Sequence, residues 1–268
     1  MAIHHGDRLV YLVTGASRGI GLEYVKQLLE RGHHVIAAAR NPEKSGGLTT
    51  LAEQHGSQLT LVTMDVAVPA SIQAAATSIS EAFPEGIDVL INNAGISGTI
   101  VKSSEQDGDE FKDILMINSL GPFLVIKAFL TLIRKGSKKQ IVNISSGLGS
   151  IATAAHYLNG GPSKLGPLKG ADSPMAKRQL GYRASKAALN MTTVALAVDL
   201  QEEGITIIAM CPGWVDTDMG SGAAGMLGVA KPPLTAPTSV AMQLKVVDGL
   251  NLEKSGTYFN HEGNVVPF

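Results

Sequence analysis

A short apolar run near the N-terminus leads directly into a glycine-rich turn. Residues 9–13 (LVYLV) predict a buried strand, and the sequence TGASRGIG follows at residues 14–21. Apolar side chains then recur at the spacing of one helix face from Ile20 to Leu29, and Gly32 ends this helix. A strand, a glycine-rich turn and a helix start in this order predict a phosphate site, because glycines allow close backbone approach and the helix start offers unpaired N–H groups. A tight turn without a ligand is the alternative interpretation.

Strand and helix patterns alternate along the rest of the chain. Four more apolar runs predict strands, at residues 34–39, 59–64, 87–91 and 140–144. Helical patterns lie between them, at residues 22–30, 71–83 and 111–133. Such alternation is typical of parallel strands joined by right-handed helical crossovers. We therefore predict an α/β fold: a Rossmann-type, doubly wound parallel sheet of about seven strands, with helices on both faces, in a single domain over residues 1–268.

The predicted strands all end in residues that suit a ligand site. In open parallel sheets, ligands bind beyond the carboxyl ends of the strands. Gly15, Arg40, Asp65, Asn93 and Ser146 all follow such ends. We expect these five residues to lie around one site, with Asp65 placed to cap an adenine.

The end of the second strand indicates which cofactor is bound. An acidic residue here would hold the ribose 2′-hydroxyl of NAD. Ala39 and Arg40 stand there instead, and Arg18 lies in the glycine-rich turn. Two guanidinium groups suit the 2′-phosphate of NADP, which arginine can hold through paired charge-assisted hydrogen bonds. The alternative is that Arg40 is a solvated loop residue paired with Glu43.

Tyr182 and Lys186 are a candidate pair for proton transfer. Residues four apart share a helix face, and of the five tyrosines only Tyr182 has a lysine at this spacing. A phenol has an ordinary pKa of about 10, and a neighbouring ammonium favours the phenolate. We therefore expect Lys186 to lower the pKa of Tyr182.

These motifs together resemble those of the short-chain dehydrogenase/reductase family, in its 250-residue type. The resemblance runs from about Leu9 to the C-terminus, with one insertion, and it rests on six motifs. They are Thr14-Gly15, Gly19 and Gly21 of the cofactor loop, Asn92–Gly95, Asn118, Ser146, Tyr182 with Lys186, and Pro212-Gly213 followed by Thr217. The closing run 255–260, with Gly263 and Pro267, resembles the C-factor/sniffer-like carbonyl reductase branch.

The resemblance implies the residues of the site. The expected catalytic residues are Asn118, Ser146, Tyr182 and Lys186. The expected cofactor-binding residues are Gly15, Ser17, Arg18, Gly19, Ile20, Gly21, Arg40, Asp65, Val66, Asn93, Ala94, Gly95, Tyr182, Lys186, Pro212, Gly213, Val215 and Thr217. No metal is expected.

The family resemblance also implies an activity, the interconversion of a ketone or aldehyde and an alcohol with NADPH/NADP as cofactor. Tyr182 would donate or accept the proton, Ser146 would stabilise the carbonyl oxygen, and Lys186 would bind the nicotinamide ribose. Asn118 would hold a water molecule that links Lys186 to solvent. Two alternatives remain open, a non-catalytic NADPH-binding regulator and a nucleotide-dependent epimerase or dehydratase of related fold.

Composition and charge agree with one soluble domain of the cytoplasm. The net charge is −1 without a basic run, which argues against nucleic-acid binding. We expect no membrane span, because Lys127 interrupts the longest apolar stretch. No signal-peptide pattern precedes Arg8, and the single cysteine, Cys211, fits a reducing compartment.

An insertion separates two of the expected catalytic residues. Ser146 and Tyr182 are 36 positions apart, much farther than is usual for the family. Glycine and proline in residues 159–167 predict a loop, and we expect the insertion at about 150–180 to lie over the substrate entrance. It would also crowd the surface through which relatives pair, so we expect a monomer rather than a homodimer.

Two features near Pro212 allow more than one role. Trp214 either walls the substrate pocket or belongs to the core. Asp216 and Asp218 are interpreted as a solvated turn or helix cap rather than as a catalytic carboxylate pair.

Overall fold

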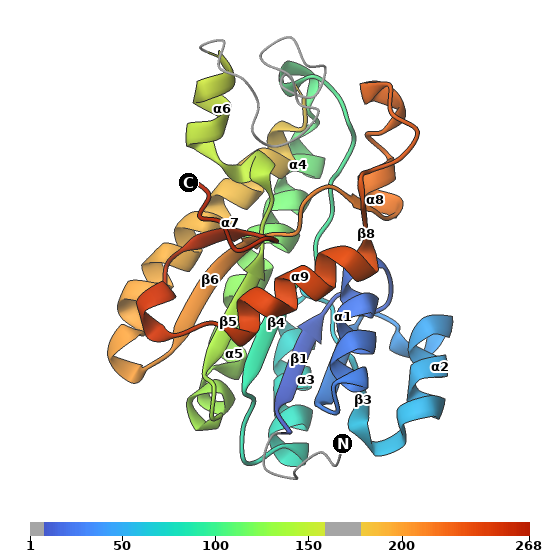
Figure 1. Cartoon of the computed structure of the whole chain (residues 1–268), viewed down its shortest axis with the longest axis vertical. Coiled ribbons are helices and arrows are strands. Elements are labelled where there is room, and N and C mark those ends of the chain that lie inside the picture. The colour runs from blue at the N-terminus through green and yellow to red at the C-terminus, as the bar shows by residue number, and fades with distance from the viewer. Residues whose placement is uncertain (1–7, 159–177) are drawn as a thin grey trace.

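The computed structural model describes residues 8–158 and 178–268, with a central parallel sheet between helices (Figure 1). In this part of the chain the sheet has seven strands in the order β3-β2-β1-β4-β5-β6-β9. Their bounds are β1 Val10–Thr14, β2 His34–Ala39, β3 Leu59–Thr63, β4 Val89–Asn92, β5 Gln140–Ile144, β6 Thr206–Cys211 and β9 Tyr258–Asn260. The strand order reverses at β1, which is paired with β2 on one side and β4 on the other. The predicted doubly wound α/β fold is confirmed.

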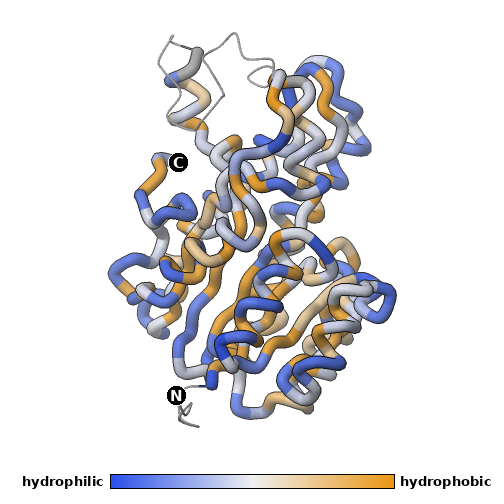
Figure 2. The backbone as a smooth tube through the Cα atoms, turned by 45° about the vertical axis from the view of Figure 1, so that its right-hand side comes forward, coloured by the Kyte–Doolittle hydropathy of each residue, from blue (hydrophilic) through white to orange (hydrophobic). Residues whose placement is uncertain are grey.

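Helices cover both faces of the sheet because each strand buries both sets of its alternating side chains. Tyr11 and Val13 of β1 pack in one hydrophobic cluster with α1, α2 and α9, whereas Leu12 packs in another with α3, α5 and α7. Figure 2 shows the resulting apolar strands at the centre of the molecule. The bounds of these six helices are α1 Gly19–Glu30, α2 Gly46–His55, α3 Pro69–Ala82, α5 Gly121–Lys135, α7 Leu180–Asp199 and α9 Ala236–Asp248. Helix α2 was not foreseen from the sequence.

The helix predicted at residues 111–133 is longer than expected and is not uniform. It comprises α4 (Gly108–Leu115), a π-helical turn, η4 (Met116–Leu120), and α5. The turn contains Asn118, and such π-turns inside helices often mark functional sites. The wider helical turn therefore lies at one of the expected catalytic residues.

The same helical run corrects one prediction. Gly108–Lys135 is long and apolar enough, by length and composition alone, to cross a membrane, so the expectation that Lys127 rules out such a stretch is wrong. Its apolar side chains Val125, Phe129 and Ile133 are buried in the hydrophobic core against the sheet. Buried core helices commonly meet the same length criterion.

The beginning of the insertion differs from the predicted loop. Residues Ile151–Leu158 form helix α6, which follows the 3₁₀ turn η5 (Gly147–Gly149). The predicted loop at 159–167, and the placement of residues 159–177 over the substrate entrance, lie outside the described residues. Helix α7, which carries Tyr182 and Lys186, begins shortly after them, at Leu180.

The remaining elements lie near the carboxyl ends of the strands. A second, two-stranded sheet pairs β7 (Val215–Asp216) with β8 (Leu234–Thr235), and the four-residue α8 (Asp218–Ser221) follows β7. In Figure 1, α4, α6 and α8 gather at the upper end of the molecule, above the sheet. The other short 3₁₀ turns are η1 Pro42–Lys44, η2 Gly56–Gln58, η3 Ser103–Glu105, η6 Gln201–Glu203, η7 Gly225–Leu227 and η8 Leu252–Lys254.

Candidate active site

The glycine-rich turn is held against the loop that follows β4. The Thr14 hydroxyl oxygen accepts hydrogen bonds from the backbone N–H groups of Asn93 (3.1 Å) and Ala94 (3.0 Å). In return, the Asn93 side-chain amide donates to the carbonyl oxygens of Thr14 (2.9 Å) and Gly15 (3.2 Å). The asparagine therefore locks the two loops together across neighbouring strands.

Gly15 cannot be replaced without displacing this arrangement. Its φ angle is +64°, in the left-handed region that glycine favours, and a Cβ here would lie 2.7 Å from the Ala94 Cα. Helix α1 begins four residues later, and its N-cap residue, Arg18, makes no side-chain hydrogen bond to the helix start. The first turn of α1 thus lacks a side-chain cap and faces the loop, which is the arrangement that binds an anionic phosphate.

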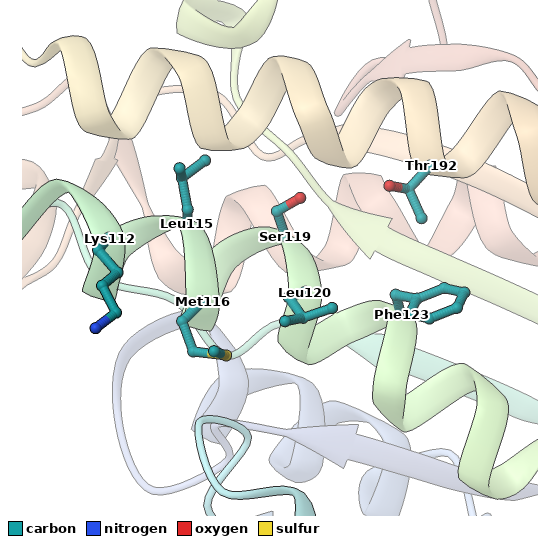
Figure 3. A pocket seen from close by; sticks show the side chains of 7 residues that line it. All are labelled: Lys112, Leu115, Met116, Ser119, Leu120, Phe123 and Thr192. Atoms are coloured by element: carbon teal, nitrogen blue, oxygen red, sulfur yellow. The ribbon is translucent and has the colours of Figure 1, made fainter.

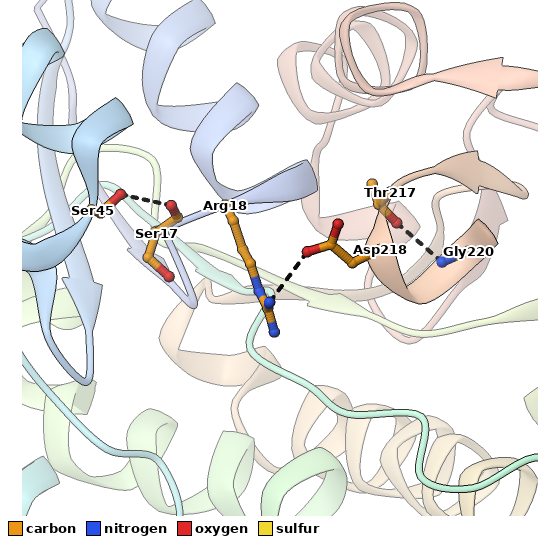
Figure 4. Close-up of polar contacts among 6 residues, drawn as sticks. All are labelled: Ser17, Arg18, Ser45, Thr217, Asp218 and Gly220. Carbon is orange, nitrogen blue, oxygen red and sulfur yellow. Dashed lines mark hydrogen bonds and ion pairs between the residues drawn. The ribbon is translucent and has the colours of Figure 1, made fainter. Parts of the chain in front are cut away.

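Two further contacts connect the turn to more distant parts of the chain (Figure 4). The Ser45 hydroxyl donates to the carbonyl oxygen of Ser17 (2.7 Å), and Arg18 Nη1 lies 3.2 Å from Asp218 Oδ2. Asp216 and Asp218 are both exposed, which agrees with a solvated turn, whereas the N-cap of α8 is Thr217 and neither aspartate caps the helix. The ion pair itself was not foreseen. Both side chains are more than three-quarters exposed, so the pair adds little to stability.

The ends of β2 and β3 form the next part of the site. Arg40 is exposed on the rim of the site. It forms no ion pair with Glu43, although the structure describes both residues. Asp65 accepts a hydrogen bond from the Ala67 N–H at 2.9 Å, and its own N–H donates to Ser71. The carboxylate is thereby held in a fixed turn beyond β3.

Asn118 holds the π-helical turn to the loop after β4. Its side chain is fully buried, its Oδ1 accepts from the Ile96 N–H (2.8 Å), and its Nδ2 donates to the Ile96 carbonyl (2.8 Å) and to Ser185 (3.0 Å). Three segments meet at this one amide. Gly95 stands beside Asn118, and a Cβ added to this glycine would lie 3.1 Å from Asn118 Oδ1 and 3.7 Å from Lys186 Nζ.

Tyr182 and Lys186 share a face of α7, with the ammonium nitrogen 5.9 Å from the centre of the phenol ring. The Ser146 side chain is close enough to the Tyr182 phenol to lower its pKa, so the 36-position interval in the sequence does not separate these two hydroxyls. Lys186 is buried and donates to the carbonyl oxygen of Ile144 at 2.7 Å. The strand that precedes Ser146 and the helix that carries Tyr182 are therefore connected directly.

The expected lowering of the tyrosine pKa is not what the structure gives. Burial raises the pKa of Tyr182 to about 12, and the hydrogen bond from Ser146 only partly opposes this rise. Burial also lowers the pKa of Lys186 to about 8. In both cases the largest cause is desolvation of the charged form, so both groups move toward their neutral forms.

The segment 212–217 closes the site from the end of β6. Gly213 has a φ angle of +81°, and the Pro212 carbonyl accepts from the buried Ser239 hydroxyl at 2.6 Å. Val215 is buried in β7. Trp214 is half-buried and donates through Nε1 to the Gly220 carbonyl at 2.8 Å, so it braces α8 rather than the strand.

These elements surround a cleft of about 460 Å³. Of the expected site residues, four do not line it: Asn118, Ser146, Gly213 and Val215. Asn118 and Val215 are buried behind the wall, and Gly213 and Ser146 stand beside lining residues. Ala39, at the end of the second predicted strand, also lines the cleft, and sequence reasoning missed nine further lining residues: Met64, Ile96, Ile117, Ile144, Ser145, Asp216, Asp218, Met219 and Ala236. Most are direct neighbours of predicted residues, and the signal that could have found them is their position beside a strand end.

The cleft fits a dinucleotide. It combines a left-handed glycine, a helix start without a side-chain cap, and arginine and aspartate side chains beyond β2 and β3. These are the features that hold pyrophosphate and ribose groups in doubly wound folds.

A second, shallower groove of about 500 Å³ lies on the outer face of the helical run that contains Asn118. Its walls are largely apolar, and Figure 3 shows Leu115 and Ser119 directed toward α7. The lining residues are Lys112, Leu115, Met116, Ser119, Leu120, Phe123 and Thr192. The sequence did not predict this groove.

Comparisons with known proteins agree with this geometry. The short chain dehydrogenase family model matches residues 9–166 and 172–225. An uncharacterized oxidoreductase of Schizosaccharomyces pombe is 34% identical over 97% of this chain and 98% of its own length. The C-signal protein of Myxococcus xanthus is 37% identical over 68% of this chain and 93% of its own length.

Solved structures give the same result. NADPH-bound carbonyl reductase from chicken fatty liver superposes with a TM-score of 0.81 and 34% identity, over 97% of this chain and 100% of that one. The carbonyl reductase Sniffer of D. melanogaster has a TM-score of 0.82 and 29% identity at the same coverage. Fold, site and sequence therefore place this chain in the short-chain dehydrogenase family of oxidoreductases.

Proposed function

We propose that this protein is an NADPH-dependent carbonyl reductase that interconverts a ketone or aldehyde and an alcohol. The observation that carries the proposal is the hydroxyl pair of Ser146 and Tyr182, with the Lys186 ammonium on the same helix face, beside a cleft built for a dinucleotide. The relatives support it as well, since one of the similar solved structures is an NADPH-bound carbonyl reductase.

The cofactor would lie along the carboxyl ends of the strands. The glycine-rich turn and the start of α1 would hold its pyrophosphate, and Asp65 would lie beside the adenine. Arg18 and Arg40 would hold the 2′-phosphate, since both line the cleft and no carboxylate follows β2 there. Ser17, Val66 and the segment from Pro212 to Thr217 would complete the binding surface.

Bound NADPH would supply the hydride, and the residues of the chain would handle the proton. In the reductive direction, Tyr182 donates its phenolic proton to the carbonyl oxygen. A raised pKa suits this role, because the phenol remains protonated at neutral pH. The Ser146 hydroxyl donates a hydrogen bond to the same oxygen and stabilises the negative charge that develops there.

Lys186 then restores the proton that Tyr182 has lost. Its pKa of about 8 leaves it mostly protonated at neutral pH, yet able to release a proton easily. Asn118 keeps the wall of the site in place through its bonds to Ile96 and Ser185. The role that family resemblance gives Asn118, holding a water molecule, is part of this proposal.

A substrate panel tests the proposed activity. Loss of the NADPH absorbance band would be followed with a series of ketones and aldehydes, and with NADH in place of NADPH. Turnover that depends on Tyr182 supports the reductase. Tight NADPH binding without turnover on any substrate would instead favour the non-catalytic regulator, and turnover only with a nucleotide-linked sugar would favour the epimerase or dehydratase.

The cellular setting is also part of the proposal. The single cysteine is buried and without a disulfide, which is consistent with the reducing cytoplasm. We expect a small carbonyl or alcohol as substrate and a monomer as the working form, with no nucleic-acid or membrane partner. The segment 159–177, on which the monomer expectation rests, lies outside the described residues.

A further inference from the structure

The closing residues of the chain fold back along the edge of the sheet. After β9, the Asn260 side-chain oxygen accepts hydrogen bonds from the backbone N–H groups of Glu262 (3.0 Å) and Asn264 (2.9 Å), which closes a tight turn. Val265 then pairs antiparallel with Phe259, and the Val266 N–H donates to the Tyr258 carbonyl at 2.8 Å. The returning chain therefore covers the outer edge of β9.

Beyond this point the closing residues contact the segment that follows Ser146. The Ser150 hydroxyl donates to the Pro267 carbonyl at 2.6 Å, and the Ala152 N–H donates to the Phe268 carbonyl at 2.9 Å. The Phe268 ring also stacks on Tyr258, with 5.7 Å between ring centres. Ser150 is fully buried, and its hydroxyl also lies 2.7 Å from the Thr153 hydroxyl and accepts from the Thr153 N–H at 3.0 Å, so it ties the closing residues to the start of α6.

The segment from Ser146 to Ser150 packs closely against helix α7. The Gly149 N–H donates to the Ser146 carbonyl at 2.8 Å, so η5 moves together with the serine. A Cβ on Gly149 would lie 2.7 Å from the Lys186 Cβ. On the other side, the Gly147 N–H donates to Cys211 Sγ at 3.2 Å. The closing residues thus hold this segment from outside while α7 supports it from within.

We propose that Phe268 and Ser150 are positioning residues that hold Ser146 against Tyr182 for the reaction. This inference deepens the proposed function and rests on it. Neither residue lines the cofactor cleft, so both act through the 146–150 segment. A shift of the serine by about 1 Å is enough to lower turnover roughly 10- to 100-fold.

Four substitutions test the contacts one by one. Phe268→Ala and Ser150→Ala should lower kcat roughly 10- to 100-fold, while the NADPH dissociation constant changes by less than about twofold. Phe268→Tyr and Ser150→Thr keep the ring and the hydroxyl, and should restore most of the rate. Val265→Ala, at a neighbouring side chain that is 70% exposed, is the matched control and should leave kcat unchanged.

A double-mutant cycle separates positioning from general loosening. In a Ser146→Ala background, Phe268→Ala should have little further effect on kcat, because its effect passes through the serine. An equal loss with and without Ser146 overturns the proposal.

The pH dependence of alcohol oxidation with NADP should also change. Loss of the serine hydrogen bond raises the pKa of Tyr182, so the rise of this rate with pH should move to higher pH in Phe268→Ala.

Hydrogen exchange provides a readout that needs no turnover. The amide protons of Gly149 and Ala152 should exchange faster in Phe268→Ala and Ser150→Ala, with no change at Asn93 of the cofactor loop. Unchanged protection of these two amides overturns the proposal. If the wild-type protein reduces no carbonyl compound while these amides respond as expected, the proposed function fails and the positioning contact stands.

Discussion

The ammonium nitrogen of Lys186 lies 2.7 Å from the carbonyl oxygen of Ile144, and this contact joins helix α7 to the strand that precedes Ser146. Ile144 is the last residue of β5, and Ser146 follows it two positions later. The lysine therefore sets the distance between the two candidate catalytic segments, in addition to any role in proton transfer. Because burial lowers the pKa of Lys186, the charge of this ammonium, and with it the contact, depends on pH.

Replacing Tyr182 with phenylalanine removes the hydroxyl of the proposed proton donor and keeps its ring. We expect NADPH affinity to remain nearly unchanged and turnover to fall by about two orders of magnitude or more, the range of general acid catalysis. Steady-state rates and fluorescence titration with NADPH measure the two effects. Tyr11→Phe, at a buried tyrosine outside the cleft, is the control. Retention of more than about a tenth of the wild-type turnover would show that Tyr182 is not the donor.

Arg40 should decide the choice of cofactor. Loss of a charge-assisted hydrogen bond to the 2′-phosphate costs about 1.5–3 kcal/mol, so Arg40→Leu should weaken NADPH binding roughly 10- to 100-fold. Ala39→Asp combined with Arg40→Leu should then favour NADH, measured as the ratio of kcat/KM values. Arg31→Leu removes an arginine paired with Asp248, away from the cleft, and should leave this ratio unchanged. A double variant that still prefers NADPH to the wild-type extent means that Arg40 is only a surface residue.

The ion pair between Arg18 and Asp218 should compete with the binding of the 2′-phosphate of NADPH. If Arg18 serves the 2′-phosphate, Asp218 competes for its guanidinium, and Asp218→Asn should tighten NADPH binding slightly, by no more than about fivefold for an exposed pair. NADH, which lacks the phosphate, should bind as before. Isothermal titration with both cofactors measures the difference. An equal change for NADPH and NADH would mean that the ion pair has no part in the selection.

Lys186 should give the fold without cofactor a characteristic pH dependence. Its pKa falls from the ordinary value of 10.5 to about 8 in the folded protein, so the unfolded chain binds more protons between these values and stability must rise with pH across this window. At neutral pH the buried charge costs roughly 3 kcal/mol. Lys186→Met should therefore be more stable than the wild type at pH 7.

The stability difference between Lys186→Met and the wild type should narrow as the pH rises from about 8 toward 10.5. Thermal unfolding at several pH values, without cofactor, measures this trend. Lys127→Met, at an exposed lysine on α5, should show no such narrowing. A difference that stays constant with pH would mean that Lys186 is not held in an environment that disfavours its charge.

Assembly is a separate question that sedimentation can answer. We expect a single species with the mass of one chain at micromolar concentration. The α7 surface nevertheless exposes Met191 and Val198, and an apolar face of this kind often belongs to an interface. A stable dimer or tetramer would contradict the monomer expectation. If Met191→Lys then dissociated it, the interface would be assigned to α7.

Much of this site was predictable from local patterns. The apolar run before Thr14 predicts β1, and the glycines after it predict a turn that side chains would obstruct, so the phosphate loop is evident from a few consecutive residues. The order of strands and helices predicts parallel pairing, and parallel pairing brings Gly15, Asp65 and Asn93 to one edge of the sheet. These features depend on periodicity and backbone freedom, which neighbouring residues determine.

Tertiary structure decided what depends on burial and on contacts between distant residues. The sequence spacing of Tyr182 and Lys186 suggested a lowered tyrosine pKa, but the folded site removes water from both groups and shifts the tyrosine upward instead. The π-turn at Asn118 and the return of Phe268 to the segment after Ser146 are also absent from any local pattern. Desolvation and long-range packing act only once the chain has folded, because they depend on which residues surround a group rather than on which residues precede it.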